Sequence, residues 1–315
     1  MISSRIETDT KKCQLLWQEF SPKKLLFDLW DFWSAFYTVY RHQPYFIVLQ
    51  ENNKSVGLLP LWYEKEKKKY YWFGGLWQDG ISFWVKKPAY ILHFLSLCPK
   101  DTFLNGIAIE EKIAQEIKKF VSTCKKSDFG PDDPKYILDL IGIKSFDDYL
   151  AGLKKDRRKS IKKDLLLIEK QNPEIIFDNF QDFQYLIEFN KSRFKNEVVQ
   201  NDPWRYVGWR DKREVEAFLN IIQSKQKEFQ PRMITVRINK KIAGVDFVVV
   251  SRGCYYTFVC GYDVNNFPGI GNYFNMLDIK DALKLGLKKI DSLQGDYGWK
   301  HRWYKEAPLY YFTKE

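Results

Sequence analysis

Two stretches of the chain, one in each half, show the same pattern of hydrophobic and polar positions. In each stretch, two apolar runs rich in β-branched and aromatic residues flank a short polar turn, and a glycine stands early in the second run. This pattern predicts a β-hairpin. The paired runs are 45–50 with 56–62, and 233–238 with 242–250.

A third strand of aromatic residues is expected after each hairpin. Residues 70–73 (YYWF) follow the first hairpin, and residues 255–259 (YYTFV) follow the second. Gly57 and Gly244 hold the same place in the two hairpins and stand about 190 residues apart, a spacing that suits two domains and is too long for a solenoid repeat. The sequence therefore predicts two copies of one domain.

Helical periodicity fills the intervals between these strands. Apolar residues recur at helical spacing over 25–40, 183–194 and 215–222, so each stretch predicts a helix that covers a sheet face. The longest such stretch, 146–170, is expected to begin with Ser145 and Asp148 as a capping box, and it carries seven lysines and arginines between 154 and 163.

The predicted elements give an α/β fold class, with mixed sheets and flanking helices. A segment rich in helix and strand breakers, 127–134, separates the two halves. We place the domain boundary near residue 143. The first domain then covers 1–143, and the second covers 144–315 and begins with the basic helix.

The composition narrows the classes of ligand and of compartment. Lysine and arginine number 51 against 40 acidic residues, so the net charge of +11 favours an anionic ligand such as a phosphorylated cofactor, RNA or an acidic lipid surface. The five cysteines are scattered without a C-x-x-C pair, which argues against a disulfide framework and a zinc site. We expect no metal and a cytoplasmic setting, because the N-terminus has no export signal and the apolar runs are shorter than the roughly 20 residues of a membrane span.

A glycine-rich turn after the second aromatic strand is a candidate phosphate site. It contains Pro268, Gly269, Ile270, Gly271 and Asn272 and precedes a helical run over about 273–285. Glycine lets a backbone approach its ligand closely, and the free N–H groups of a helix N-terminus favour an anion. Proline and glycine are also ordinary turn residues, so this segment alone leaves a phosphate site and a simple turn equally open.

The segment after a short predicted strand, 288–293, is dense in titratable and aromatic side chains. It includes Asp296, Tyr297, Trp299, Lys300 and His301. Asp296 and Lys300 are four residues apart and, taken alone, favour an exposed ion pair of little energetic weight.

Asp246 differs from its neighbours because it interrupts the apolar run 242–250. It lies on the same predicted face as Gly244 and Val248. A buried carboxylate is costly without a partner, so Asp246 is either a functional acid or is held by an arginine or a backbone donor.

Two segments of the second half resemble a known family. GYDVNNFPGIGNYF (261–274) and KLGLKKIDSLQGDYGWKHRWYKE (284–306) resemble the C-terminal half of the CelD/BcsL group of GNAT-type acetyltransferases. The basic segment LKKDRRKSIKKDL and the N-terminal RHQPYFIVLQENNKSVGLLPL are similar to that family too. The chain departs from the family pattern at Phe267, where serine is usual, and at Trp299, where tyrosine or phenylalanine is common. The late aromatic–lysine pair is also similar to that of Fem-type transferases, which add aminoacyl groups from tRNA to peptidoglycan precursors.

The resemblance implies tandem GNAT-like domains and direct acyl transfer from a bound donor to an amine or hydroxyl. The pantetheine arm of acyl-CoA would run along the strand 255–262, and the phosphates would rest on the turn 268–272. Lys300 would stabilise the developing oxyanion or bind an acidic group of the substrate, and Asp296 would accept the amine proton or orient Lys300. The other implied site residues are His301 and Asp246 as further acids or bases, Tyr262 beside the donor, and Asp79, Tyr297 and Trp299 at the acceptor.

Three functions from different classes follow. The first is an acyltransferase that uses acetyl-CoA or another acyl-CoA to modify an envelope polysaccharide or a related small acceptor. The second is a Fem-type transfer from charged tRNA to a peptidoglycan or lipid-linked precursor. The third is a non-catalytic protein that binds membranes or RNA through the basic segment 146–170, which also permits an enzyme to contact the inner membrane face peripherally.

Overall fold

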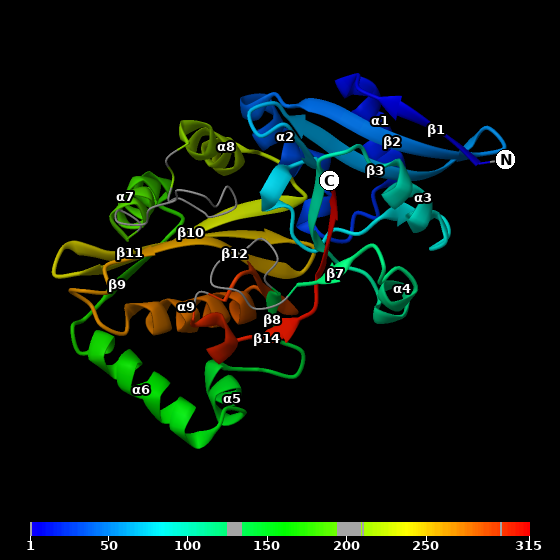
Figure 1. Cartoon of the computed structure of the whole chain (residues 1–315). Coiled ribbons are helices and arrows are strands. Elements are labelled where there is room, and N and C mark those ends of the chain that lie inside the picture. The colour runs from blue at the N-terminus through cyan, green and yellow to red at the C-terminus, as the bar shows by residue number, and fades with distance from the viewer. Residues whose placement is uncertain (1, 125–133, 194–208, 210, 297) are drawn as a thin grey trace.

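The computed structural model describes residues 2–124, 134–193, 209, 211–296 and 298–315. Within these residues the chain forms two mixed sheets, of eight and seven strands, with helices packed on them (Figure 1). The predicted α/β class with flanking helices is confirmed. Tyr297, one of the residues expected at the acceptor, and all but Pro134 of the predicted breaker-rich segment lie outside the described residues.

The first sheet has the strand order β1-β2-β3-β4-β6-β15-β7, and β5 pairs with β3. Its strands are β1 (Ile2–Glu7), β2 (Gln43–Glu51), β3 (Lys54–Glu64), β4 (Lys69–Trp72), β5 (Trp84–Val85), β6 (Thr102–Ile107), β7 (Ser122–Thr123) and β15 (Tyr310–Lys314).

The second sheet has the strand order β14-β8-β13-β12-β11-β10-β9. Its strands are β8 (Lys135–Asp139), β9 (Glu174–Phe177), β10 (Phe229–Ile238), β11 (Lys241–Ser251), β12 (Cys254–Tyr262), β13 (Lys289–Gln294) and β14 (Lys305–Ala307).

The two sheets share one plan. In each, four strands pair antiparallel in succession, the next pairing is parallel, and the last two are antiparallel again. Both predicted hairpins are present, as β2–β3 and β10–β11, and both aromatic strands follow them as β4 and β12. The internal repeat read from the sequence is therefore a repeat of topology.

The sheets exchange strands across the middle of the chain. β8 precedes residue 143 and yet pairs with β13 in the second sheet, while β15 ends the chain and pairs with β6 in the first. A single cut near 143 therefore leaves each sheet one strand short, and the boundary that we placed there stays a prediction about the sequence repeat.

Helices cover the sheets between the strands, as the periodicity predicts. The helices of the first half are α1 (Thr10–Phe20), α2 (Trp30–Tyr40), α3 (Tyr90–Leu97) and α4 (Glu111–Glu116). Those of the second half are α5 (Phe146–Ala151), α6 (Lys155–Glu169), α7 (Phe183–Arg193), α8 (Lys212–Gln223) and α9 (Ile270–Lys284). No helix in the described part of the chain is long and apolar enough to cross a membrane.

The predicted long basic helix is two helices. Ser145 caps α5 as expected, since its hydroxyl accepts the Asp148 N–H at 3.1 Å. The helix ends at Ala151, with Gly152 as its C-cap, and α6 begins at Lys155, so the expectation of one helix over 146–170 was wrong. Glycine is a poor helix former, and the apolar spacing of the two pieces did not reveal the interruption.

Aromatic side chains from both halves pack into one core. Phe27 of the first half contacts Tyr256 and Phe258 of β12, with ring centroids 5.6 and 6.0 Å apart. Phe36 of α2 contacts Phe218 of α8 at 5.7 Å. The two halves are therefore held against each other by apolar contacts near β12, the strand that leads to the candidate site.

Candidate active site

The parallel strands β12 and β13 separate toward the candidate site. Their residues pair only at the start, where 254–256 lie opposite 289–291, although β12 continues to Tyr262. A side-chain bond from Thr257 to Ser292, at 3.1 Å, marks the point where they part. β12 also shifts register against β11 between Phe247 and Val248, as a β-bulge does. The backbone of β12 beyond Thr257 is therefore not paired with β13. One of its carbonyls, that of Cys260, already accepts from Asn190 of α7.

The first turn of α9 follows β12, at the predicted glycine-rich turn. Gly269 has a φ of +90°, and a Cβ there would come within 3.0 Å of the Cβ of Asp164 in α6. This glycine thus serves the close packing of α6 on α9, a role we had not predicted for it. The N–H groups of Gly271 and Asn272 have no partner among the described residues, so these two amides are the part of the turn that can receive an anion.

Two side-chain contacts join this turn to the closing segment. Asn272 donates to Asp164 at 2.5 Å and accepts from the Trp303 indole N–H at 3.0 Å. Asn275, one turn further along α9, accepts from the Tyr304 hydroxyl at 2.8 Å. The start of α9 and the segment after β13 are consequently fixed relative to each other.

Asp296 and His301 form a hydrogen-bonded pair in that closing segment. His301 Nδ1 lies 2.7 and 2.9 Å from the two carboxylate oxygens of Asp296, and the His301 backbone N–H donates to Oδ1 at 2.9 Å. Asp296 is 2% exposed, whereas the His301 side chain is 47% exposed. A buried carboxylate that holds Nδ1 keeps the proton on that nitrogen and leaves Nε2 able to accept one.

Lys300 lies where we did not expect it. The sequence suggested either an exposed ion pair with Asp296 or an ammonium that faces a cleft, but Lys300 is 7% exposed. Its ammonium donates to the backbone carbonyls of Ser292 and Gln294. Burial lowers the pKa of Lys300 to about 8, against the opposing effect of nearby carboxylates. The lysine therefore holds the end of β13.

The end of β13 is kinked at Leu293, whose φ of +59° is unusual for a branched side chain. Asp79, from the loop after β4, accepts the Gln294 N–H at 2.7 Å. Asp79 is also paired with Lys135, which contacts Asp291 as well, each at 2.9 Å. Asp79 is 4% exposed and fully engaged in these contacts. It thus joins the two halves at the kink, and we no longer assign it to the acceptor.

Asp246 is buried under α9, and its place in the apolar run 242–250 had raised the question of its partner. Its partner is neither an arginine nor a backbone donor: the Tyr262 hydroxyl donates to Asp246 at 2.6 Å. Burial raises the pKa of Asp246 to about 7. Burial, and then the charge of Asp246, raise the pKa of Asp278 in α9 well above its usual range. The two carboxyls therefore favour holding a proton between them.

The remaining predicted residues lie beside these groups. Tyr262 stacks on Phe274 at 4.7 Å, Ile270 is fully buried, and Pro268 is exposed. Trp299 is partly buried, and its ring contacts Tyr304 at 6.2 Å. The structure thus brings Trp299, Lys300 and His301 to one segment beside α9, while Asp79 and Asp246 have partners of their own.

The sequence reasoning missed four of these partners. Lys135, Asp291, Asp164 and Asp278 were not singled out, although each has a buried or half-buried ionisable side chain. Asp278 left a signal, because Asn275, Asp278 and Asp281 recur every three residues on a helix whose neighbours are apolar. No such signal in the sequence marked Lys135, because a lysine at the start of a strand is common.

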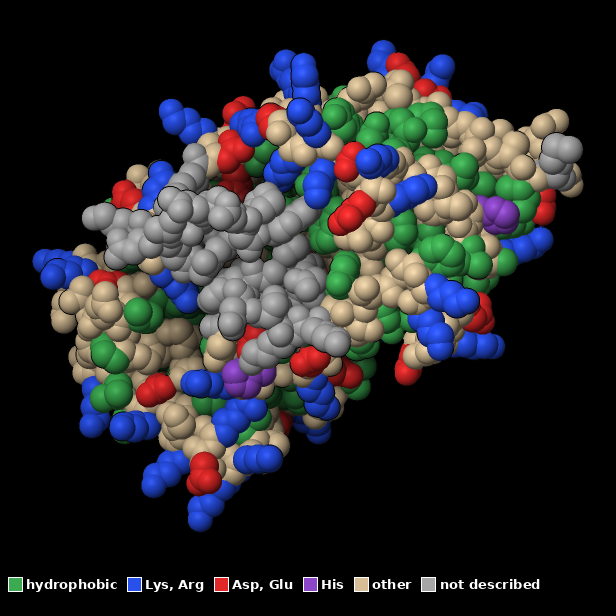
Figure 2. Space-filling model, viewed as in Figure 1, with side chains coloured by type: hydrophobic (Ala, Val, Ile, Leu, Met, Phe, Trp, Pro, Cys, Tyr) green, Lys and Arg blue, Asp and Glu red, His purple; other side chains and the backbone are tan. Residues whose placement is uncertain are grey.

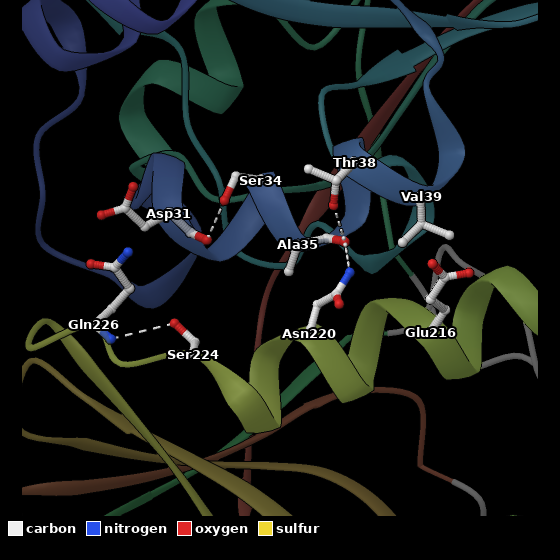
Figure 3. Close-up of a pocket in the computed structure, with 9 residues that line it drawn as sticks. All are labelled: Asp31, Ser34, Ala35, Thr38, Val39, Glu216, Asn220, Ser224 and Gln226. Carbon is white, nitrogen blue, oxygen red and sulfur yellow. Dashed lines mark hydrogen bonds between the residues drawn. The ribbon is translucent and has the colours of Figure 1, made fainter.

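A separate groove of about 410 Å³ lies between α2 and α8 (Figure 3). Its lining is polar, and Asp31, Ser34 and Thr38 of α2 face Glu216 and Asn220 of α8. No site residue predicted from the sequence lines it. Within the described residues, no three His, Cys, Asp or Glu side chains are placed to hold a metal ion.

Comparison with known proteins assigns the part of the chain that carries these groups. Residues 155–301 match the family model of the acetyltransferase (GNAT) domain. This segment is a GNAT-type acyltransferase domain. It runs from the start of α6 to His301, so the GNAT-type domain contains the splayed strands, the α9 turn and the Asp296–His301 pair. No curated protein matches the sequence.

Solved structures similar to the chain extend over both halves. FemX has a TM-score of 0.58 at 11% identity, with 98% of this chain and 96% of that chain covered. The C-terminal domain of a protein described as a lysylphosphatidylglycerol synthetase from Agrobacterium fabrum gives 0.55 at 8% identity, covering 95% and 93%. A tandem GNAT protein from the clavulanic acid biosynthesis pathway gives 0.52 at 10% identity, covering 99% and 98%. At these identities the likeness concerns the fold, which is the tandem GNAT arrangement.

Proposed function

We propose that the protein transfers an acyl group from acyl-CoA, with acetyl-CoA as the first candidate, directly to an amine. The observation that carries the proposal is the Asp296–His301 pair, which lies inside the GNAT-type domain and just before Trp303 and Tyr304, the residues that bond to the first turns of α9. Acyl transfer to an amine requires a base for the amine proton and a site for the donor. The pair offers the base, and the splayed strands with the α9 turn offer the site.

The donor is proposed to lie between β12 and β13. Its pantetheine arm follows the β12 backbone beyond Thr257, where pairing with β13 has ended. Its diphosphate rests on the amides of Gly271 and Asn272 at the positive end of α9. The net charge of +11 favours this polyanion over an uncharged donor.

The chemistry needs no covalent enzyme intermediate. The amine nitrogen attacks the thioester carbonyl carbon, a C–N bond forms, and the carbonyl oxygen becomes the oxyanion of a tetrahedral intermediate. His301 Nε2 accepts the proton that the nitrogen loses, and Asp296 stabilises the resulting imidazolium. The C–S bond then breaks, and the thiolate leaves and takes up a proton. Lys300 acts as a positioning residue, because its ammonium holds the kinked end of β13 that precedes Asp296.

The acceptor is proposed to be an amino sugar of an envelope polysaccharide or a precursor of one. The support is the resemblance of segments 261–274 and 284–306 to the CelD/BcsL group, and it is support by analogy. A hydroxyl acceptor would use the same base. The first half, joined to the site through Asp79, is proposed to form one wall for this acceptor.

A Fem-type aminoacyl transfer from charged tRNA is the second candidate. It is favoured by one observation: FemX shares the fold over 98% of this chain, both halves included. The two candidates differ in the donor, since CoA needs only the α9 turn, whereas tRNA needs a broad cationic surface whose affinity falls steeply with salt.

One paired measurement separates the candidates. Acetyl-CoA or CoA should raise the melting temperature of the protein, because a ligand that binds only the folded state stabilises it. Release of the CoA thiol with glucosamine and related amino sugars then tests transfer. If neither CoA nor acetyl-CoA shifts the melting temperature while tRNA binds tightly and with a steep salt dependence, the acyl-CoA proposal is wrong.

A further inference from the structure

Helix α6 presents two opposite faces, of which only one packs against the protein. Ile161, Leu165 and Ile168 are buried, and the helix lies against α9 through this face. At 100° per residue, the opposite face is a stripe that runs the whole length of the helix. We call this stripe the α6 outer face; it consists of Lys155, Asp156, Lys159, Lys163, Leu166, Leu167 and Lys170, all exposed, with the exposed Lys162 at its border, so that one acid stands among five cations.

The lysines of the α6 outer face are spaced so that they destabilise the helix. Lys155, Lys159 and Lys163 follow one another at intervals of four, and like charges at that spacing destabilise a helix. In the described part of the chain no ion pair of these lysines relieves that repulsion. A counter-charge supplied from outside would remove the cost.

Two leucines complete the α6 outer face. Leu166 is 52% exposed and Leu167 is 43% exposed, and both stand next to the lysines in the last turns of the helix. Large apolar side chains beside a row of cations are the pattern of helices that lie in the headgroup layer of a membrane, where the lysines meet lipid phosphates and the apolar side chains enter the acyl boundary.

The position of α6 leaves its outer face accessible. The helix runs along the edge of the molecule below the second sheet, away from the first half (Figure 1). Lysine and arginine side chains project along this lower edge, with apolar side chains near them (Figure 2). A flat surface can therefore approach the helix along its length without contact with the first sheet.

We propose that the α6 outer face docks the protein on an anionic lipid bilayer. The lysines are attracted by acidic headgroups, each adding to the affinity, and Leu166 and Leu167 insert at the interface. RNA would use the lysines equally well, but it offers no apolar layer for the leucines. The opposite face of α6 packs on α9, so a docked protein holds the start of α9 at a fixed height above the membrane.

The test is flotation of the full chain with vesicles, without donor or acceptor, so its outcome does not depend on the proposed reaction. Vesicles of phosphatidylcholine with phosphatidylglycerol should bind the protein, and vesicles of phosphatidylcholine alone should bind it poorly. The variant Lys159→Gln/Lys163→Gln should weaken binding about 30-fold, which corresponds to about 2 kcal/mol. Leu166→Asn/Leu167→Asn should weaken it as well, and circular dichroism confirms that each variant is folded.

The matched control is Lys65→Gln/Lys68→Gln, which removes two exposed lysines from the turn between β3 and β4. It loses the same charge and should bind the acidic vesicles as the unaltered chain does. The proposal is overturned if the unaltered chain does not float with acidic vesicles, if the control loses as much binding as the α6 variants, or if the leucine variant binds normally. It is also overturned if the lysine substitutions abolish RNA binding and leave vesicle binding intact.

Discussion

Replacement of Asp296 by asparagine tests the Asp296–His301 pair with the smallest change of shape. The His301 backbone N–H, 2.9 Å from Oδ1, needs an acceptor, so the amide oxygen of the new side chain stays at that position. The amide nitrogen then takes the place of Oδ2, which lies 2.7 Å from His301 Nδ1. An N–H donor at this nearer position favours Nδ1 as an acceptor over its longer contact with Oδ1, at 2.9 Å, and the ring proton then moves to Nε2.

The expected loss of turnover follows from the loss of Nε2 as a proton acceptor. A ring that carries its proton on Nε2 cannot accept one from the amine, and general-base catalysis contributes about 100- to 10,000-fold to a rate. We therefore expect Asp296→Asn to lower kcat by that factor, equivalent to about 3–5 kcal/mol of transition-state stabilisation. KM for acetyl-CoA should change little, because the donor is proposed to bind at β12 and at the α9 turn.

The assay is release of the CoA thiol in the presence of an amino sugar acceptor, with KM and kcat measured separately. Asp28→Asn is the matched control: Asp28 is also buried, at 3% exposure, and its carboxylate accepts two backbone N–H groups in the first half. It should lose stability without loss of turnover. The reasoning fails if Asp296→Asn keeps the turnover of the unaltered enzyme, or if Asp28→Asn loses as much.

Three further predictions concern the groups around this pair. Lys135→Met leaves Asp79 and Asp291 buried without their cation, so urea denaturation should show a loss of about 3–5 kcal/mol, more than for the exposed Lys65→Met. The pKa of Lys300 is about 8 in the folded chain and 10.5 ordinarily, so the unfolded chain binds more protons between these values. The free energy of unfolding should therefore rise with pH across this window, and the rise should be smaller in Lys300→Met. Gly271→Ala has room for its Cβ, 3.7 Å from the Tyr262 ring, so it should preserve stability. It keeps the N–H but adds a methyl group that hinders close approach of the diphosphate to the backbone, so the thermal shift with CoA should be smaller; an undiminished shift would place the diphosphate elsewhere.

Elements set by local pattern were predictable, and those set by distant contacts were not. The β-branched and aromatic runs around a polar turn, with Gly57 or Gly244 early in the second run, identified both hairpins, because the residues that favour a strand and its turn lie within the segment itself. The pattern of β8 or β15 says only that each is a strand. The sheet that each of these strands joins is decided by contacts with strands far away in the sequence, and the residues of the strand itself do not indicate those contacts.

In the candidate site too, the residues that lie close in sequence were predictable, but the contacts that each side chain makes were not. The sequence placed Asp296, Lys300 and His301 in one segment, and their closeness is confirmed by the structure. Their pairing was not predictable from spacing, because Asp296 and Lys300 at an interval of four suggested an ion pair. The short helix at Lys300–Arg302 instead brings the His301 N–H to the carboxylate and lets the Lys300 ammonium reach back to β13.

The strand exchange connects the first half to the candidate site, although none of the proposed catalytic groups comes from that half. β8 supplies Lys135 to the second sheet, and Lys135 is held by Asp79 from the first half and by Asp291 from β13. Asp79 also fixes the Gln294 N–H, two residues before Asp296. The direction in which the chain leaves β13, and with it the place of the Asp296–His301 pair, therefore depends on a carboxylate more than 200 residues earlier in the sequence. A second domain separated from the first would keep its sequence motif but lose the contact that orients the Asp296–His301 pair.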